Sequence, residues 1–567
     1  MSAYEDVVSF LGEWGAFQKT VFFLLSASSI PNGYMGLAAV FLADTPPHHC
    51  RLQPENAGRN ASELNQFIPL QEFEGKAALS SCTRYKQLNK SSTGTQNATE
   101  GCLNGWEFSS DRYTSTIVTE WNLVCEDAWK VPFATSALFF GMLTGTFISG
   151  PISDRFGRKL ALFASLAMQI VFTLLQAASN RWELYCICYF LGGMGSTAKY
   201  NAAFVLGYEL LGKSPRVVFS ALGISLCYAV GCAALPLFAF FVRGWRMLLL
   251  ALALLQLLCV PMWWFIPESP RWLLSHGRLQ EAEAIVQAAA KRNGVLAPSV
   301  IFTLDDCTPL NGSNKKLQQL YLNLFKTKDI RNITVLNLII WMVTAMTYSG
   351  VSLGIPNLDG NPYLNCAFSA ATEMAAYAAA WFVMRCCMRR SSLFVMQLLC
   401  GFTLLVVQLI PSELSSVAVA VVMLGKLGTS AAFCFLYTYS TELLPTVVRN
   451  VGLGAASISG CIGSIVAPYI THMGEFNKYL PYILMGGLSV FVGFLGLLLP
   501  ETKDTELPEH ISQVKPLRCA SVVRGENGVG SLSEQGPPRL TRAGKAPAPR
   551  GRLLLASQEC GGSGPAF

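Results

Sequence analysis

Long apolar segments recur along most of the chain, and they constrain its fold more than any other feature of the sequence. A helix that crosses the hydrocarbon core of a bilayer needs about 20 mostly apolar residues. Six such runs come first, with a long polar segment after the first of them: Thr20–Leu42, Phe133–Ile152, Leu160–Ala178, Glu183–Val205, Val217–Val242 and Met247–Ile266. Six more come after a charged stretch: Ile333–Gly354, Tyr363–Met384, Leu393–Ile410, Val417–Tyr439, Val447–Ile470 and Leu480–Leu499. The pattern predicts an all-α polytopic membrane protein with two halves of six helices each.

The composition agrees with a chain embedded in a bilayer. Hydrophobic residues make up 52% of the 567 residues and charged residues only 14%, whereas soluble domains carry about 25% charged residues. The net charge of +7 is small for this length and forms no basic stripe, so we expect no nucleic-acid partner. The five histidines show no ligand spacing, and no catalytic constellation is apparent. We therefore expect neither an enzyme nor a metal site, and no resident cofactor.

The apolar runs divide the chain into five parts. We expect a cytoplasmic N-terminus at 1–19, an N-terminal six-helix half at 20–266 with a large loop at 43–132, and a cytoplasmic linker at 267–332. The C-terminal half then covers 333–500, and a cytoplasmic tail covers 501–567. Alanine-rich amphipathic spacing from Leu279 to Lys291 predicts short helices in the linker. Gly, Pro, Ser and Arg dominate the tail, which predicts disorder over most of it.

The long first loop carries features that are useful only outside the cell. Disulfides and N-linked glycans form on the lumenal or extracellular side of a membrane. The loop holds four cysteines and three N-x-S/T sequons: Cys50, Cys82, Cys102, Cys125, Asn60, Asn89 and Asn97. We expect an extracellular, glycosylated loop with two disulfides. Four cysteines allow three pairings, and the sequence does not choose among them.

Lysine and arginine in the short loops give the same orientation. With a cytoplasmic N-terminus, most basic loop residues lie inside, and the short outside loops hold only Arg181, Arg243, Arg246 and Lys478. Such a bias is typical of cytoplasmic loops. We expect a multi-pass plasma-membrane protein with both termini in the cytoplasm.

The segment between the second and third spans carries a specific motif. Gly150, Asp154, Arg155, Gly157, Arg158 and Lys159 fit the pattern G-x-x-x-D-[RK]-x-G-[RK]-[RK], and the segment resembles the signature loop of the major facilitator superfamily. The resemblance implies a cytoplasmic gate, in which Asp154 and the arginines contact helix ends of the other half. The alternative is an ordinary positively charged inside loop.

Further acidic and basic residues sit at the cytoplasmic ends of other spans. Residues 267–273 (PESPRWL) resemble the sugar and organic-ion branch of that superfamily, and residues 441–450 and 500–502 repeat the theme in the second half. The gate we expect includes Glu209, Glu268 and Arg271 in the first half, and Glu442 with Arg449 in the second.

Four segments narrow the resemblance. FLGEWG at 10–15, LLSASSIPNG at 24–33, IVTEWNLVCED at 117–127 and WWFIPESPRW at 263–272 resemble the organic cation/carnitine transporters, and the likeness runs to about Pro508. It implies a twelve-helix transporter of organic cations or of zwitterions such as carnitine or ergothioneine, working by alternating access. It also implies sodium as a possible coupling ion, since carnitine uptake in that family is sodium-coupled symport.

One motif belongs to another class of protein. Gly207, Gly212, Lys213 and Ser214 match the phosphate-loop pattern G-x-x-x-x-G-K-[ST]. A working phosphate loop lies between a strand and a helix, so that backbone N–H groups converge on the phosphates. Here the pattern leaves a predicted transmembrane helix, so we interpret it as a turn at the end of that helix.

Polar and aromatic residues inside spans mark the candidate substrate pathway, because such residues are costly in a bilayer. Asn32 follows Pro31 at an expected break in the first helix, and Gln169 matches a glutamine that the carnitine carriers use for sodium. The charges Glu373 and Lys426 need partners, which could be each other or the substrate. Five aromatic residues could enclose a quaternary ammonium or simply pack between helices: Tyr200, Tyr228, Tyr348, Phe433 and Tyr437.

Two positions depart from the carnitine carriers. Lys199 stands where they have an asparagine of the sodium and substrate region, and Cys461 stands where they have an arginine suited to a carboxylate. Lys199 could act as a built-in cation that replaces sodium, could bind the substrate carboxylate, or could have no role in transport. A cysteine does not replace the planar fork of arginine, so these changes put sodium-coupled carnitine uptake in question.

Two rival functions stay open at this point. One is an organic-anion carrier of the same superfamily, and the other is a scaffold or sensor that has lost transport. The chain ends in Ala566 and Phe567, and a hydrophobic last residue is what PDZ-type modules read. Pro565, however, stands where such ligands hold Ser or Thr.

Overall fold

The computed structural model describes residues 7–51, 67–73, 76–86, 99–298, 301–302, 324–445, 448–475, 477–503, 505 and 508. The chain divides into two units, Met1–Cys519 and Ala520–Phe567, and all described residues belong to the first unit. The three sequons at Asn60, Asn89 and Asn97 and the C-terminal Phe567 lie outside the described residues.

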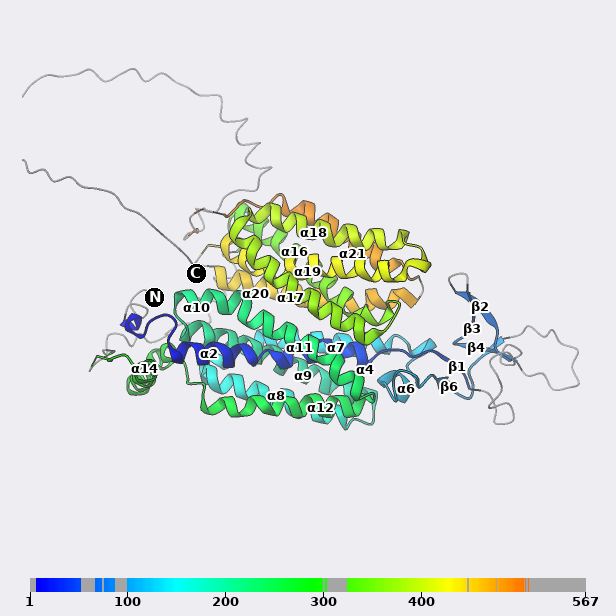
Figure 1. Ribbon diagram of the computed structural model, residues 1–567, viewed down its shortest axis with the longest axis horizontal. Helices are drawn as coiled ribbons and strands as arrows, with labels where there is room; N and C mark the ends of the chain where they lie inside the picture. The colour runs from blue at the N-terminus through cyan, green and yellow to red at the C-terminus, as the bar shows by residue number, and fades with distance from the viewer. Residues whose placement is uncertain are drawn as a thin grey trace, which may run out of the picture. The chain divides into compact units, whose positions relative to one another are not determined.

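The first half contains six spans, drawn from blue to green in Figure 1. They are formed by α2 (Ala16–Ala27), α3 (Ile30–Leu37) and α4 (Ala39–Leu42); α7 (Lys130–Phe156); α8 (Arg158–Ala177); α9 (Trp182–Leu210); α10 (Lys213–Val218), η4 (Phe219–Gly223) and α11 (Ile224–Phe241); and α12 (Trp245–Gln256) with η5 (Leu257–Trp264). The first span breaks just before Pro31, as the sequence predicts. There the hydroxyls of Ser28 and Ser29 donate to backbone oxygens three residues earlier, which satisfies carbonyls that the break frees.

The second half contains the other six spans: α16 (Lys328–Leu353), α17 (Pro362–Cys386), α18 (Arg389–Val406), α19 (Ser415–Leu443), α20 (Arg449–His472) and α21 (Leu480–Gly496). Within the described residues, nine helical segments are long and apolar enough to cross a membrane by length and composition alone. The other three are α21, which has 17 residues, and α9 and α17, which carry charges within their length. The predicted arrangement of twelve helices in two halves is confirmed.

Each half contains a large apolar core, and that of the first half also includes Ile355, Cys366 and Ala370 of the second. Two helix pairs join the halves. Close approach of backbones inside each half depends on glycine. A Cβ on Gly33 would lie 2.0 Å from the carbonyl oxygen of Tyr228, and a Cβ on Gly463 would lie 2.0 Å from that of Met342. Between the halves, α7 packs along α20 and α11 packs along α17. Residues on α7, α11, α17 and α20 therefore line the seam between the halves.

The long first loop folds into strands, which the all-α prediction did not include. Six short strands pair antiparallel: β1 (His48–Cys50) with β6 (Trp106–Phe108), β2 (Leu70–Phe73) with β3 (Lys76–Leu79), and β4 (Thr83–Tyr85) with β5 (Thr99–Gly101). One disulfide joins Cys50 of β1 to Cys102, just after β5, and the other joins Cys82, just before β4, to Cys125 near the end of the loop. The structure thus selects one of the three possible pairings. The loop ends in α6 (Ile117–Trp121) and η3 (Cys125–Asp127).

The linker contributes two helices at the end of the bundle opposite the strands (Figure 1). They are α13 (Pro270–Ser275) and α14 (Leu279–Asn293), and α14 matches the helix predicted from Leu279 to Lys291. Asn293 ties α14 to the start of α2, because its amide donates to the carbonyl of Leu11 at 3.0 Å and its Oδ1 accepts from the backbone of Phe17 at 2.9 Å.

Candidate functional site

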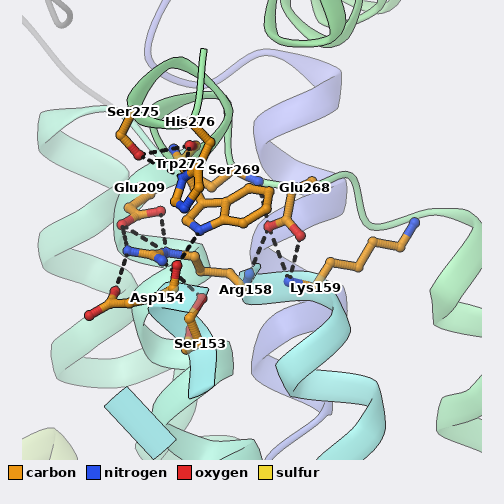
Figure 2. A network of polar contacts seen from close by, with 10 residues as sticks. All are labelled: Ser153, Asp154, Arg158, Lys159, Glu209, Glu268, Ser269, Trp272, Ser275 and His276. Atoms are coloured by element: carbon orange, nitrogen blue, oxygen red, sulfur yellow. Dashed lines mark hydrogen bonds and ion pairs between the residues drawn. The ribbon is translucent and has the colours of Figure 1, made fainter. Parts of the chain in front are cut away.

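A polar network closes the end of the first half where the signature motif lies (Figure 2). Arg158 is at its centre: its guanidinium pairs with Asp154 at 2.9 Å and with Glu209 at 3.2 Å. Glu268 accepts backbone N–H groups of Arg158, Lys159 and Ser269 at 2.9 to 3.1 Å. It thus caps the start of α8, where a carboxylate is favoured by the exposed N–H groups and the helix dipole. The network joins the ends of α7, α8 and α9 to the linker.

Gly157 is the residue that makes this cap possible. Its φ is +102°, a backbone conformation that L-residues with side chains rarely adopt. A Cβ at this position would also lie 2.5 Å from Oε2 of Glu268. The glycine of the motif is therefore required both by the turn between α7 and α8 and by the carboxylate that fits against it.

The second half repeats the arrangement with other residues. Arg389 pairs with Glu442 at 3.1 Å, and Glu501 accepts the backbone N–H groups of Arg389 and Arg390 at 2.7 and 3.1 Å. The expectation that Arg449 is the partner of Glu442 is wrong. Arg449 begins α20, and its Nε donates to the carbonyl of Leu444 at 3.3 Å, so it covers the end of α19 instead.

Among the residues that the structure describes, Asp154 makes no ion pair with a helix end of the other half, contrary to the prediction. Asp154 is 72% exposed and pairs with Arg158 four residues away. Arg155 lies over the ring of Phe156, and Arg271 lies in the first turn of α13. Among the described residues, the Arg158 network includes no residue of the second half, and the Arg389 network includes no residue of the first half.

At the opposite end of the bundle, aromatic contacts do cross between the halves. Tyr363, at the start of α17, stacks on Phe41 of α4 with ring centres 5.4 Å apart. Its ring also meets Phe240 at 5.6 Å, and its hydroxyl donates to the carbonyl of Arg112 at 3.3 Å. We call Phe41, Tyr113, Phe240 and Tyr363 the outer aromatic cluster. It connects the second half to the first at the end that carries the disulfides.

A buried carboxylate lies between these two ends. Glu373, near the middle of α17, is fully buried. The hydroxyls of Tyr348 and Tyr377 both donate to its Oε1, the latter at 2.8 Å, while no partner is present for Oε2 among the described residues. An unpaired buried carboxylate oxygen is costly in a membrane interior. Glu373 therefore presents one oxygen for a cation.

The other buried charge of this half lies close by. Lys426 on α19 is 1% exposed; its ammonium lies 3.9 Å from the ring centre of Tyr348 and donates to the hydroxyl of Ser352. No direct ion pair joins Lys426 to Glu373 within the described residues, so Tyr348 connects them. We call Tyr348, Ser352, Glu373, Tyr377 and Lys426 the glutamate cluster. Neither Tyr377 nor Ser352 was predicted from the sequence, although each lies one helical turn after a predicted residue.

Aromatic residues extend the glutamate cluster. Phe433 stacks on Tyr348 with ring centres 5.4 Å apart, and Tyr437 meets Trp341 at 4.6 Å. Tyr228, on α11 of the first half, lies close to Tyr348. The predicted aromatic residues Tyr228, Tyr348 and Phe433 thus come together at the seam.

Tyr200 and Cys461 lie elsewhere. Tyr200 packs against the apolar core at one end of the first half. Cys461 lies on α20 close to Thr146 of α7, so it lies where the two halves meet along the other helix pair.

A second polar cluster lies inside the first half. Asn32 and Ser196 hydrogen-bond to each other, with Nδ2 donating to the Ser196 carbonyl at 3.3 Å and the Ser196 hydroxyl donating to Oδ1 at 3.2 Å. A Cβ on Gly195 would lie 3.0 Å from the backbone nitrogen of Gln169, so Gln169 packs at the same level. Lys199 is one turn further along α9. We call Asn32, Gln169, Ser196 and Lys199 the lysine cluster.

Lys199 and Gln169 lack polar partners. Both are 1% exposed, and neither the ammonium of Lys199 nor the side-chain amide of Gln169 has a hydrogen-bond partner among the described residues. Buried polar groups are normally satisfied. The structure therefore contains a buried lysine and a buried amide with unused hydrogen-bonding capacity, and Lys199 lies one helical turn from the Ser196 that binds Asn32. The resemblance predicted sodium at Asn32 and Gln169.

The phosphate-loop match is helical in the structure. Gly207 lies inside α9, where a Cβ would lie 2.3 Å from the ring of Phe219. Gly212 precedes α10, which contains Lys213 and Ser214. No strand leads into this segment, whose neighbours on both sides are described and helical. The interpretation as a helix-end turn fits this geometry. Within the described residues, no group of three His, Cys, Asp or Glu side chains could hold a metal ion.

Comparisons with known proteins agree on one family. The model of the sugar (and other) transporter family matches residues 77–514. Human organic cation/carnitine transporter 2 is 48% identical over 526 residues, which cover 91% of this chain and 94% of that protein. Mouse solute carrier family 22 member 4 is 47% identical over 530 residues, which cover 91% and 96%.

The fold also matches a solved structure of the major facilitator superfamily. The proton:xylose symporter XylE bound to 6-bromo-6-deoxy-D-glucose aligns with a TM-score of 0.56 and 14% identity, over 88% of this chain and 99% of that one. At this identity the match concerns the fold alone. This chain belongs to the sugar (and other) transporter family of the major facilitator superfamily, and within it to the group of the organic cation/carnitine transporters.

Proposed function

We propose that the protein carries an organic cation, or a zwitterion with a cationic group, across the plasma membrane by alternating access. The observation that carries the proposal is the buried carboxylate of Glu373, whose Oε2 has no partner within the described residues. The names of its relatives, organic cation/carnitine transporter 2 among them, support the same substrate class.

The surroundings of Glu373 suit a quaternary ammonium. Such a group cannot donate a hydrogen bond, so it is held by charge and by aromatic faces. Each cation–π contact contributes about 0.5–2 kcal/mol. Tyr348 and Phe433 are stacked next to the carboxylate, and Tyr228 reaches Tyr348 from the other half. A cation bound here would contact both halves, which is the position that alternating access requires.

The carboxylate of a zwitterion needs a cationic partner. Cys461 provides none, whereas Lys426 places a buried ammonium over the ring of Tyr348, whose hydroxyl donates to Glu373. We assign the anionic end of a zwitterion to Lys426. When the substrate is an organic cation without a carboxylate, Lys426 would keep its hydrogen bond to the hydroxyl of Ser352. Both substrate types therefore fit the same site.

The contacts between the halves support an inward-facing state. The outer aromatic cluster joins the halves at the disulfide-bearing end, while the ion pairs of Arg158 and Arg389 at the other end stay within one half. Because disulfides form on the oxidising side of a membrane, the aromatic cluster is extracellular. Both termini and the linker then lie in the cytoplasm.

We propose further that transport does not require sodium. Lys199 is buried on α9 one helical turn from Ser196, which binds Asn32, and from Gly195, which packs on Gln169. The resemblance predicted sodium coupling at Asn32 and Gln169, and we assign to Lys199 the role of a fixed cation in their place. A second cation at this site would be repelled by the ammonium in a medium of low dielectric constant. Among the three possible roles of Lys199, burial inside one half favours the built-in cation over contact with substrate.

Uptake of labelled tetraethylammonium and labelled L-carnitine into cells expressing the protein tests the substrate class. We expect Glu373→Gln to lower cation uptake by about 30-fold or more, because losing one partner of a buried charge pair costs about 2–5 kcal/mol. Glu413→Gln, at an exposed carboxylate, is the control at equal surface expression. Full uptake by Glu373→Gln would reject the site.

Uptake of a labelled organic anion separates the rival functions. If labelled p-aminohippurate enters while neither cation nor carnitine does, the protein is an anion carrier. If no probe enters, it is a scaffold or sensor, and a PDZ-type partner of the C-terminus becomes the next question.

A further inference from the structure

Two adjacent cysteines mark the end of α17 at the cytoplasmic boundary. Eleven cysteines in the described part of the chain are free, and only Cys386 and Cys387 among them are exposed. They close a helix of 25 residues. At 1.5 Å per residue this helix is about 37 Å long, somewhat more than the hydrocarbon core of about 30 Å. Its last residues therefore reach the headgroup region.

The side on which the two thiols lie is given by the disulfides. Cys50–Cys102 and Cys82–Cys125 belong to the loop at the other end of the helices (Figure 1). Thiols are kept reduced in the cytosol and are oxidised outside it. Cys386 and Cys387 are thus placed on the reducing side, where free thiols persist.

The lipid-facing surface of α17 leads directly to Cys386. Ala375, Ala379, Phe382 and Cys386 are exposed and succeed each other at intervals of four, three and four residues, a spacing that places them on one helix face. Phe382 is 63% exposed, and Met388, just beyond the cysteines, is 59% exposed. Glu373 and Tyr377 occupy the opposite, buried face. The thiol of Cys386 therefore ends an apolar strip that faces lipid.

Basic residues surround the pair. Arg385 lies over the ring of Trp381 at 4.0 Å, and Lys503 donates to the carbonyl of Cys386 at 2.8 Å. Arg390 lies at the start of the next helix, beside Arg389, whose guanidinium is already paired with Glu442. Such a cationic rim attracts anionic lipid headgroups and polyanionic acyl donors.

We propose that Cys386 and Cys387 form an S-acylation site that takes a long-chain acyl group from acyl-coenzyme A. The cysteine thiolate attacks the thioester carbonyl, a new carbon–sulfur bond forms, the bond to coenzyme A breaks, and the coenzyme leaves as its thiol with the proton. Juxtamembrane cysteines are typical acceptors of this modification. The acyl chain would lie along the apolar strip that contains Phe382.

Mass-tag exchange on the full-length protein from mammalian cells counts the acylated thiols. Free thiols are blocked, thioesters are cleaved with hydroxylamine, and each released thiol receives a polyethylene glycol tag. The wild type should show tagged forms that Cys386→Ser and Cys387→Ser each reduce by one step and that the double variant reduces by two. Cys188→Ser, at a buried thiol of α9, should keep the wild-type pattern.

Two results would overturn the proposal. One is a wild type without tagged forms while an acylated marker protein from the same cells is tagged. The other is a double variant whose pattern equals that of the wild type, which would assign the acyl groups to cysteines elsewhere, such as Cys307, Cys519 or Cys560. Surface biotinylation of each variant confirms that it folds and leaves the endoplasmic reticulum.

Discussion

The hydroxyl of Tyr377 donates a 2.8 Å hydrogen bond to Oε1 of Glu373, one helical turn earlier on α17. Tyr348 donates to the same oxygen from α16. Two donors on one oxygen hold the carboxylate in a single orientation and leave Oε2 for the substrate. The selectivity of the site thus depends also on the two tyrosine hydroxyls that orient the carboxylate.

We expect Tyr377→Phe to raise the KM for an organic cation about tenfold with little change in the maximal rate. A hydrogen bond to a charged group contributes about 1.5–3 kcal/mol, and its loss lets the carboxylate rotate away from the position that favours the cation. Concentration-dependent uptake of tetraethylammonium measures both constants. Tyr482→Phe on α21, outside the glutamate cluster, is the control, and equal KM values for the two variants would show that Tyr377 does not position Glu373.

Gly157 allows a second test, because the chain offers a matched glycine. We expect Gly157→Ala to lower the stability of the protein by about 1–3 kcal/mol, since a side chain is strained at positive φ and the new Cβ would meet Glu268. Gly150→Ala in the same motif should have little effect, because nothing lies within 4 Å of its Cβ position. Thermal unfolding in detergent compares them. Equal melting temperatures would mean that the cap of α8 does not depend on this turn.

The apolar runs predicted the spans because a bilayer requires continuous apolar length, and that requirement is local in sequence. Contacts between distant residues were harder to predict. Arg389 and Arg449 are both basic and lie near the same membrane face, so composition could not tell which one pairs with Glu442. The internal repeat could have done so: Arg158 and Glu209 are 51 residues apart, and Arg389 and Glu442 are 53 apart.

Other features differ in how much local signal they had. The disulfide pairing depends on how the strands of the first loop meet, and four cysteines are compatible with three pairings. The roles of Tyr377 and Ser352 could have been inferred from helical spacing, since each comes four residues after Glu373 or Tyr348. The burial of Lys199 inside one half, by contrast, depends on the rotation of α9, which no single segment determines.

The extracellular boundary should show a pH dependence that involves Asp44. Burial raises the pKa of this carboxyl above its ordinary value, and the nearby Tyr113 and the charge of Arg112 offset this only in part. The folded state therefore holds the proton more tightly than the unfolded state. The contribution of Asp44 to the free energy of unfolding is therefore fully present below the pKa of the unfolded state, near 3.8. It is lost as the pH rises through the pKa of the folded state.

Asp44→Asn mimics the protonated carboxyl and should remove this dependence of stability on pH. We expect the variant and the wild type to melt at the same temperature at acid pH, and the variant to melt higher at neutral pH. Asp111→Asn, at an exposed carboxylate nearby, should keep the wild-type slope. If the melting temperatures of Asp44→Asn and the wild type change with pH in the same way, the assignment to Asp44 is contradicted.

Lys199 gives the sharpest test of coupling. We expect uptake by the wild type to persist when sodium is replaced by N-methyl-D-glucamine, because the ammonium of Lys199 supplies the charge that a sodium ion would bring beside Asn32. Lys199→Asn removes that charge and adds a side-chain oxygen that could coordinate a cation, so uptake by this variant should require sodium. Lys291→Asn, at an exposed lysine of α14, should stay independent of sodium. Wild-type uptake that collapses without sodium would disprove the built-in cation whatever the variants do. A Lys199→Asn protein that reaches the surface and transports equally with and without sodium would show that the charge of Lys199 does not replace the ion.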